Sequence, residues 1–217
     1  TMGGGLVHGG DAVLNIGTYG SVFVGSDTPI RDPNQICIVK NNSGPENWTL
    51  EAASPSSGCS YKWYRDTFCG NEKMAAGMLN MDPYDLINSQ IASVHPGANG
   101  ITFLPYLQGA SAGAKDNAFA RGAFTGITAS TTKAEMACAV MEGITMEMRD
   151  NIEAIEHSGV SIDSIRITGG ATKSRLWNQM QADIYKKPVH ILQTSEAGCL
   201  GAAIYAAVGA GVFKDYD

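Results

Sequence analysis

The sequence predicts an α/β domain in which one mixed β-sheet is flanked by helices. Two observations support this fold class. Short β-prone runs follow one another over residues 12–53, as in an antiparallel meander, whereas helical and β-prone runs alternate over residues 132–208. Alternation of this kind adds parallel strands through helical crossovers, so both halves can share one sheet with helices packed against it.

The first part of the chain is expected to form the antiparallel strands. Residues 12–17 and 21–25 are joined by Thr18-Tyr19-Gly20, a combination typical of a hairpin with a tight turn. Residues 35–40 and 48–53 extend the same pattern. These segments account for the antiparallel half of the sheet.

The middle of the chain is expected to be mostly helical. A helix is expected over residues 56–70, because a serine can cap its start and aromatic residues recur along it. Around residues 71–130 the pattern is less regular and predicts an irregular helical insertion. One regular helix is expected there, over residues 83–94, because Asp82 is a suitable cap and Pro83 suits a first helical turn.

The clearest helix is expected over residues 132–157, where apolar residues recur every three or four positions and form one continuous stripe. Gly159 is placed to end this helix. Small residues in the last expected helix predict close packing against a neighbouring helix or the sheet. The remaining elements follow in the order strand, helix, strand, helix, over residues 164–168, 173–186, 189–192 and 197–208.

Composition argues against several classes of function. The 15 basic and 21 acidic residues give a formal net charge of −6 without a basic stripe, so no nucleic-acid partner is expected. The 5 cysteines are scattered, and neither they nor the 4 histidines have metal-ligand spacing, so we expect no disulfide framework and no metal site built by the chain. Cys138 is expected in the core. Neither a membrane-spanning run nor a signal-peptide pattern is visible, so we expect no membrane association and a cytoplasmic location.

Two glycine-bearing turns are candidates for a ligand site. The first is the hairpin turn at Gly17-Thr18, and the second is the Gly169-Gly170 pair between an expected strand and an expected helix. Glycine admits a ligand close to the backbone, and the first turn of a helix offers unpaired N–H donors and the positive end of its dipole. Such turns suit a phosphate-bearing nucleotide, although a glycine pair after a strand can equally serve close packing.

Four motifs resemble signatures of the FGGY family of carbohydrate kinases, in the family's order and across nearly the whole chain. Residues 15–21, NIGTYGS, resemble the family's IGTSG hairpin. FLPYLQG at 103–109 and ARGAFTGIT at 120–128 resemble its FLPYLxGER…ARGAFxGLT signature. ITGGATKSRLW at 167–177 resembles LTGGGAKSxLW, and EAGCLGAA at 196–203 resembles EGAALGAA. Among the family's members, the motifs of xylulokinase-like proteins are the most similar in sequence.

The resemblance implies the actin-like ATPase (ribonuclease H-like) fold and a place in a larger protein. Family members have two such domains with the active site between them, so residues 1–217 are expected to be a single carboxy-terminal nucleotide-binding domain. The amino-terminal domain, which would supply most sugar contacts and the first phosphate loop, is expected to be absent. The catalytic aspartate, a general base on the sugar hydroxyl, is expected just upstream of Thr1, and Asp11 does not match it. The chain alone is therefore expected to contain no catalytic residue and to be inactive.

The resemblance also implies a site for ATP, with Mg²⁺ held largely by the phosphates. Thr18 is expected to contact the terminal phosphates, while Gly170 and Ser174 are expected on the adenosine side. Ser174 can also cap a helix. Lys62 departs from the polar residue usual at its position and either reaches a phosphate or is solvated. The expected contacts are Gly17, Thr18, Gly58, Lys62, Gly169, Gly170, Ala171 and Ser174.

The activity implied for the parent protein is transfer of the γ-phosphoryl group of ATP to a hydroxyl of xylulose or a related ketose or polyol. The charge-free loop at residues 109–113 departs from the Gly-Glu-Arg sequence that the family has at this position. Ribulose, gluconate and tetritols therefore remain alternative substrates. A non-enzymatic actin-like switch module and an inactive kinase remnant are the alternative interpretations. A homodimer is left open. Arg121 is expected to pair with a carboxylate, and Trp177 is expected to be a packing residue.

Overall fold

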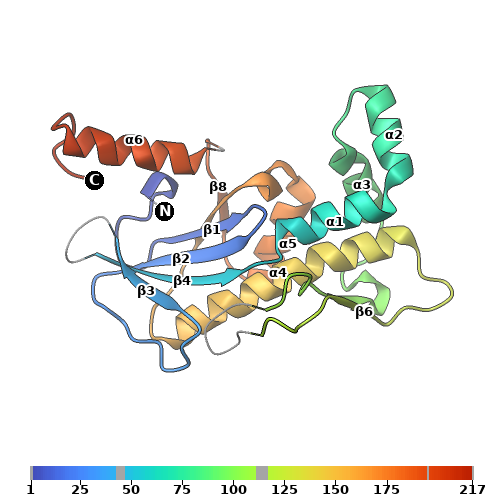
Figure 1. Cartoon of the computed structure of the whole chain (residues 1–217), viewed down its shortest axis with the longest axis horizontal. Coiled ribbons are helices and arrows are strands. Elements are labelled where there is room, and N and C mark those ends of the chain that lie inside the picture. Colours follow the sequence, from blue (N-terminus) through green and yellow to red (C-terminus); the bar gives the residue numbers. More distant parts are fainter. Residues whose placement is uncertain (1, 43–46, 111–116, 195, 217) are drawn as a thin grey trace.

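The computed structural model describes residues 2–42, 47–110, 117–194 and 196–216. Its centre is a six-stranded sheet with the strand order β3-β4-β2-β1-β7-β8 (Figure 1). The expected strands are confirmed, with their ends shifted by a few residues. The strands are β1 (Ala12–Ile16), β2 (Gly20–Ser26), β3 (Ile38–Asn41), β4 (Trp48–Ser54), β7 (Ile165–Thr168) and β8 (Val189–Ile191).

Strand β1 is where the two halves of the sheet meet. It pairs antiparallel with β2 and parallel with β7, so Asn15 lies opposite Ser21 on one side and Thr168 on the other. The hairpin half is completed by β4 and β3, and the parallel half by β8. The mixed sheet expected from the sequence is confirmed. Because β1 and β7 are parallel, the turns that follow them leave the sheet at the same edge.

Helix α4 is the main packing partner of the sheet. It lies against β2 and β4 and also contacts α1 and α5 (Figure 1). A capping box formed by Thr132 and Glu135 starts it, and Gly159, with φ +102°, follows its end, as expected. Met141, Ile144 and other residues of its apolar stripe are fully buried. The helices are α1 (Gly58–Phe68), α2 (Gly70–Leu79), α3 (Pro83–Ile91), α4 (Lys133–His157), α5 (Arg175–Tyr185) and α6 (Ala197–Gly209).

The middle segment is more regular than the sequence indicated. Helix α2 was not expected, because its large apolar residues, including Met74 and Met78, stay exposed and leave no buried stripe in the sequence. Helix α3 was expected, and the Asp82 side chain caps it by accepting the Tyr84 N–H at 3.0 Å. A separate two-stranded sheet, β5 (Thr102–Leu104) with β6 (Ala123–Thr125), also packs on α4.

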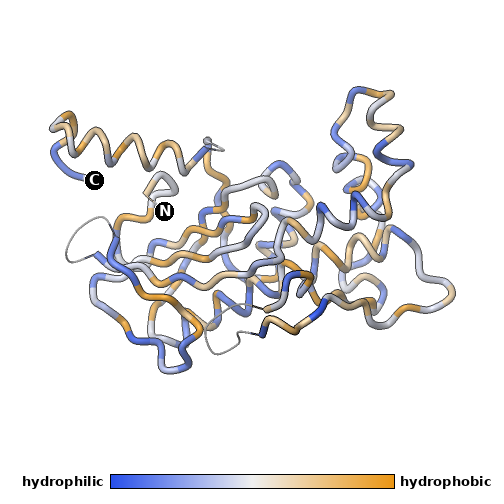
Figure 2. The backbone as a smooth tube through the Cα atoms, in the orientation of Figure 1, coloured by the Kyte–Doolittle hydropathy of each residue, from blue (hydrophilic) through white to orange (hydrophobic). Residues whose placement is uncertain are grey.

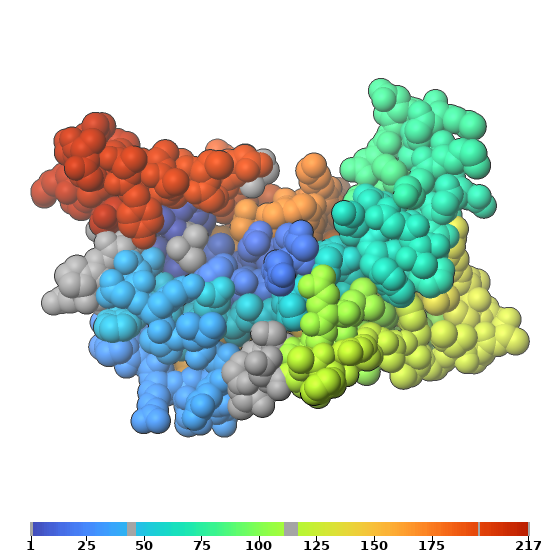
Figure 3. All heavy atoms as spheres, in the orientation of Figure 1, coloured from blue at the N-terminus to red at the C-terminus, as the bar shows by residue number. Residues whose placement is uncertain are grey.

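The last helix packs in a way that the small residues only partly predicted. Helix α6 contacts the short 3₁₀ helix η1 (Met2–Gly4) rather than the sheet (Figure 1). A Cβ on Gly3 would lie 2.0 Å from the Ala197 carbonyl oxygen, so the two segments touch through their backbones. Much of the remaining α6 surface is apolar and exposed, including Leu200 at 43% (Figures 2 and 3).

Among the described residues, Arg121 bonds backbone carbonyls rather than the expected carboxylate. Its guanidinium Nη1 donates to the carbonyl oxygens of Ala118 (2.9 Å) and Ala120 (2.8 Å), and within the described part of the chain it forms no ion pair. Cys138 is buried as expected, and burial raises the pKa of its thiol to about 12. None of the five cysteines, which all lie in the described ranges, forms a disulfide. Over the described ranges, no helix combines the length and the apolar character needed to cross a membrane.

Candidate functional site

The turns that follow β1 and β7 lie side by side at one edge of the sheet. Gly169 ends β7 with φ +93°, a conformation that favours glycine. A Cβ at this position would lie 2.5 Å from the Ile16 carbonyl oxygen and 2.7 Å from Asn15 Oδ1. Gly169 therefore seats the second turn directly against the end of β1, and the two glycine turns predicted from the sequence are neighbours in space.

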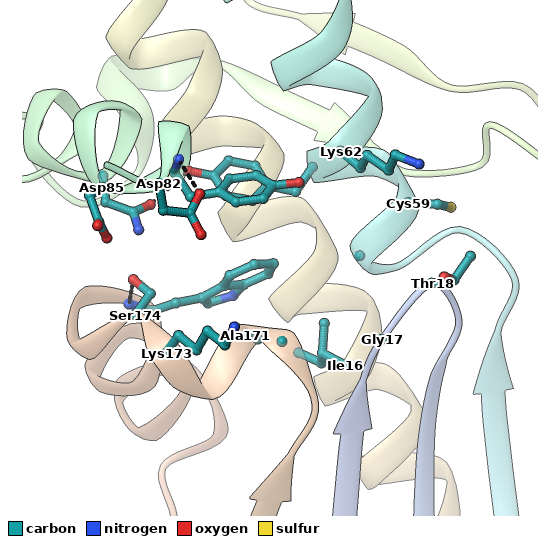
Figure 4. A pocket seen from close by; sticks show the side chains of 16 residues that line it. Ile16, Gly17, Thr18, Cys59, Lys62, Asp82, Asp85, Ala171, Lys173 and Ser174 are labelled. Atoms are coloured by element: carbon teal, nitrogen blue, oxygen red, sulfur yellow. Dashed lines mark hydrogen bonds between the residues drawn. The ribbon is translucent and has the colours of Figure 1, made fainter. Parts of the chain in front are cut away.

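A cavity of about 540 Å³ opens between these turns and the helices α1 and α3 (Figure 4). Thr18 and Cys59 lie at one end of it, whereas Ser174, Asp82 and Asp85 lie at the other. The volume is within the usual range for small-molecule and cofactor sites. The cavity is lined by Ile16, Gly17, Thr18, Gly58, Cys59, Tyr61, Lys62, Asp82, Tyr84, Asp85, Asn88, Gly170, Ala171, Lys173, Ser174 and Trp177.

At the Thr18 end, the hairpin turn is fastened to the start of α1. The Gly58 N–H donates to the Gly17 carbonyl at 2.9 Å, and the Cys59 N–H donates to the Thr18 carbonyl at 3.2 Å. A Cβ on Gly58 would lie 2.1 Å from the Gly17 oxygen, so glycine is needed for this approach. These two helix-terminal amides are thus used inside the protein. The polar group that the turn leaves toward the cavity is the exposed side chain of Thr18.

On the β7 side, the chain forms a single 3₁₀ turn, η4 (Gly170–Lys173), before α5 begins. Gly170 lines the cavity, and a Cβ built on it would meet nothing within 4 Å. Ser174 caps α5, because its Oγ accepts the Trp177 N–H at 3.2 Å, which confirms the capping role. The Ser174 hydroxyl hydrogen remains available to a ligand.

Three aromatic side chains form a wall of the cavity between its two ends. The rings of Tyr61 and Tyr84 stack with centroids 5.1 Å apart, and the Trp177 ring meets Tyr61 edge-on at 5.2 Å. The Tyr61 hydroxyl donates to Asn88 Oδ1 at 2.7 Å, and the Trp177 indole N–H donates to Thr145 Oγ1 at 2.9 Å. These bonds fix the rings. Tyr84 is held further by the Arg65 guanidinium, which lies over its ring at 4.8 Å from the centroid, so the wall borders the cavity as a fixed aromatic surface.

Charged and polar side chains complete the lining. Four exposed charged side chains lie at the rim of the cavity. Lys62 belongs to α1 and Lys173 to η4, whereas Asp82 and Asp85 lie at the start of α3. Cys59 is half-buried, and its burial, together with the nearby Glu147 carboxylate, raises the pKa of the thiol. The Cys59 thiol is therefore neutral near pH 7 and suits a packing role more than a nucleophilic one.

The structure brings together nearly every residue that the sequence singled out. Gly17, Thr18, Gly58, Lys62, Gly170, Ala171 and Ser174 line the cavity, whereas Gly169 lies behind it and holds the turn in position. The sequence did not predict the aromatic wall, and Trp177 packs as expected but also lines the cavity. A helical spacing of four residues between Tyr84 and Asn88 could have indicated that α3 presents one face to a ligand.

Asp11 has no role in this cavity. Its carboxylate accepts the N–H groups of Val7 (3.1 Å) and His8 (2.9 Å) and pairs with Arg166 at 2.8 Å. Partial burial raises the pKa of Asp11, but these hydrogen bonds and the Arg166 guanidinium lower it by more, so the net pKa lies below the ordinary value. Asp11 is therefore a structural carboxylate that holds the amino-terminal segment.

Comparison with known proteins identifies the family. The model described as "FGGY family of carbohydrate kinases, C-terminal domain" matches residues 12–210. The chain belongs to the FGGY family. It corresponds to the carboxy-terminal domain of these kinases, and the resemblance based on its motifs is confirmed.

Individual relatives agree with this assignment. The chain is 36% identical over 216 residues to a xylulose kinase of Staphylococcus epidermidis and 30% identical over 219 residues to a gluconokinase of Bacillus subtilis. In both comparisons all of the chain is matched, but it spans only 41% and 42% of the relatives' length. The solved structure of a ligand-bound xylulose kinase from Lactobacillus acidophilus superposes on the whole chain with a TM-score of 0.84 at 27% identity. The fold is therefore the actin-like ATPase fold of these sugar kinases.

Proposed function

We propose that this FGGY domain binds ATP and is the nucleotide-side half of a carbohydrate kinase. The observation that carries the proposal is the convergence of the two glycine turns on one cavity at the shared edge of β1 and β7. Ligands in open α/β sheets commonly bind outside the carboxyl ends of strands, where the chain changes direction. Bound ATP would supply the transferable γ-phosphoryl group, and the protein's contribution to such transfer is mainly positioning and charge stabilisation.

Each wall of the cavity suits one part of the nucleotide. The hydroxyl of Thr18 and the ammonium group of Lys62 lie at the end where phosphates would be held, and Gly17 and Gly58 line the same cavity. The adenosine would lie toward Ser174, along the surface that Gly170 leaves open. Gly169 and Ala171 would shape this turn without a polar contact of their own.

Mg²⁺ would be carried by the phosphates rather than by a cluster of side chains. Among the residues that the structure describes, no group of three or more His, Cys, Asp or Glu is placed to hold a metal ion. Mg²⁺ readily keeps water and phosphate oxygens as ligands, so this arrangement is sufficient for a nucleotide-bound metal. The sugar, xylulose or a related ketose, polyol or sugar acid, and the general base would belong to the rest of the parent protein.

Two features support a larger parent protein. The chain spans about two-fifths of the length of the curated relatives that it matches. Helix α6 also leaves apolar residues such as Leu200 and Ile204 incompletely covered, which is typical of a surface that another domain packs on. We propose that the amino-terminal domain packs near this surface and closes over the cavity to exclude water.

The test combines binding with turnover. Calorimetric titration of residues 1–217 with MgATP should give saturable binding with 1:1 stoichiometry, and the same chain should form no sugar phosphate. The full-length protein should release ADP only when an acceptor is added, in a screen of xylulose, ribulose, gluconate and tetritols. Absence of nucleotide binding would contradict the proposed site, and ATP binding by the full-length protein with no acceptor would favour a switch module.

A further inference from the structure

The part of the cavity that would receive the base has few ways to recognise one purine rather than another. Strong discrimination arises when a wrong ligand leaves a buried polar group unpaired, and such sites reject an analogue by roughly 10⁴-fold or more. An apolar or aromatic pocket discriminates between similar shapes by only about 10- to 200-fold. The state of the polar side chains around the aromatic wall therefore decides between these two regimes.

The buried polar atoms beside the wall are already paired inside the protein. The hydroxyl of Tyr61 bonds Asn88, and the indole N–H of Trp177 bonds Thr145. Within the described ranges, several buried side-chain nitrogen and oxygen atoms lack a partner, but none of them belongs to a residue that lines this cavity. Among the described residues, no buried side-chain group of the lining therefore depends on a particular base to complete its hydrogen bonds.

The polar groups that remain are either exposed or indifferent to the purine. Asp82 and Asp85 are exposed at the rim, so water can solvate their carboxylates when a base offers them no donor. The amide nitrogen of Asn88 and the hydroxyl of Ser174 keep donor capacity, but every purine ring offers N3 and N7 as acceptors. The rings of Tyr84 and Trp177 border the cavity and offer aromatic contact that any base can accept, although Tyr84 also stacks on Tyr61 and has the Arg65 guanidinium 4.8 Å from its ring centroid.

We propose that this site accepts purine nucleoside triphosphates as a class, so that GTP and ITP replace ATP. The proposal rests on the proposed nucleotide function, since it concerns the base of the same ligand. Affinity would come from contact with the aromatic wall and from the phosphates, and the chemical identity of the groups at purine positions 2 and 6 would contribute little.

The experiment is calorimetric titration of the full-length protein with MgATP, MgGTP and MgITP in the absence of sugar. All three should bind, with Kd values within about 200-fold of one another. A larger gap in favour of ATP overturns the proposal while the proposed function stands. Failure of all three to bind removes the proposed function and this proposal together.

Two substitutions test the source of the affinity. Tyr84→Leu should raise the Kd for ATP and GTP by a similar factor, about twofold or more, because both bases would lose the same aromatic contact. Asp85→Asn should change the ratio of the two Kd values by less than about tenfold, and a larger change would show that this carboxylate selects the base. Tyr205→Leu on α6, away from the cavity, is the matched control for loss of a tyrosine, and thermal melts check that each variant is folded.

Discussion

Gly169 and Gly170 are neighbours in the turn after β7, yet opposite consequences are expected when each is substituted. An alanine at 169 would have to adopt φ near +93° and would place its methyl group 2.5 Å from the Ile16 carbonyl oxygen. The left-handed backbone costs about 1–2 kcal/mol and the overpacking about 1–3 kcal/mol. Gly169→Ala should therefore lower the melting temperature by about 4–20 °C, at about 2–4 °C per kcal/mol for a chain of this size.

Gly170 has neither constraint. Its φ is not positive, and no heavy atom lies within 4 Å of a Cβ built there. Gly170→Val should therefore change the stability of the fold by no more than about 0.5 kcal/mol. Its branched side chain would project into the cavity where we place the nucleoside, so the Kd for MgATP should rise at least about tenfold, or about 1.4 kcal/mol.

Differential scanning fluorimetry without ligand and calorimetric titration with MgATP separate the two effects. Gly169→Ala should lose stability, and Gly170→Val should lose binding while melting like the parent sequence. Gly170→Ala should fall between the parent and Gly170→Val in affinity. If Gly170→Val binds MgATP as tightly as the unsubstituted chain, the nucleoside does not lie along this turn and the reasoning is refuted.

Three further predictions follow from individual contacts. Thr18→Val should raise the Kd for MgATP, measured by calorimetry, by about tenfold or more, because hydrogen bonds to charged groups contribute about 1.5–3 kcal/mol. Thr102→Val should show no such loss of affinity, because Thr102 is an exposed residue of β5 that does not line this cavity. The pKa of Asp11 is lower in the folded protein than in the unfolded chain, so its ionised form stabilises the fold. This stabilisation is complete above the ordinary aspartate pKa of about 3.9 and is lost as the pH falls through the lower folded-state pKa. Chemical denaturation should therefore show that Asp11→Asn is less stable at neutral pH and that its deficit shrinks below about pH 4; a deficit independent of pH would contradict the ionic role. Gly3→Ala should accelerate hydrogen exchange throughout α6, because its Cβ would lie 2.0 Å from the Ala197 carbonyl oxygen. Gly198→Ala is the control, because nothing lies within 4 Å of a Cβ at that position. Equal exchange rates in both variants would count against the η1–α6 contact.

The parts of the structure that the sequence predicted are those encoded by local pattern. The long α4 helix follows from an apolar stripe and a capping box, and the turn after β7 follows from Gly169, whose φ of +93° favours glycine. The order of antiparallel and alternating segments was sufficient to predict one mixed sheet. For the cavity, the motifs at both turns led to nearly all of its glycine and hydroxyl residues.

The parts that were missed depend on contacts between distant segments. The aromatic wall combines Tyr61 from α1, Tyr84 from α3 and Trp177 from α5, and no local pattern brings these helices together. Helix α2 carries its large apolar residues on an exposed surface, so it lacks the buried stripe by which helices are recognised in a sequence. Arg121 was expected to pair with a carboxylate, whereas among the described residues its Nη1 donates to backbone carbonyls of its own loop.

The most direct test follows the backbone amides of residues 1–217 by NMR during titration with MgATP. The amide resonances of Gly17 and Thr18 in the first turn, and of Gly170 and Ala171 in the second, should shift together and saturate with one common Kd, because both turns line the same cavity. Shifts confined to one turn, or different apparent affinities for the two, would contradict a single nucleotide held between them.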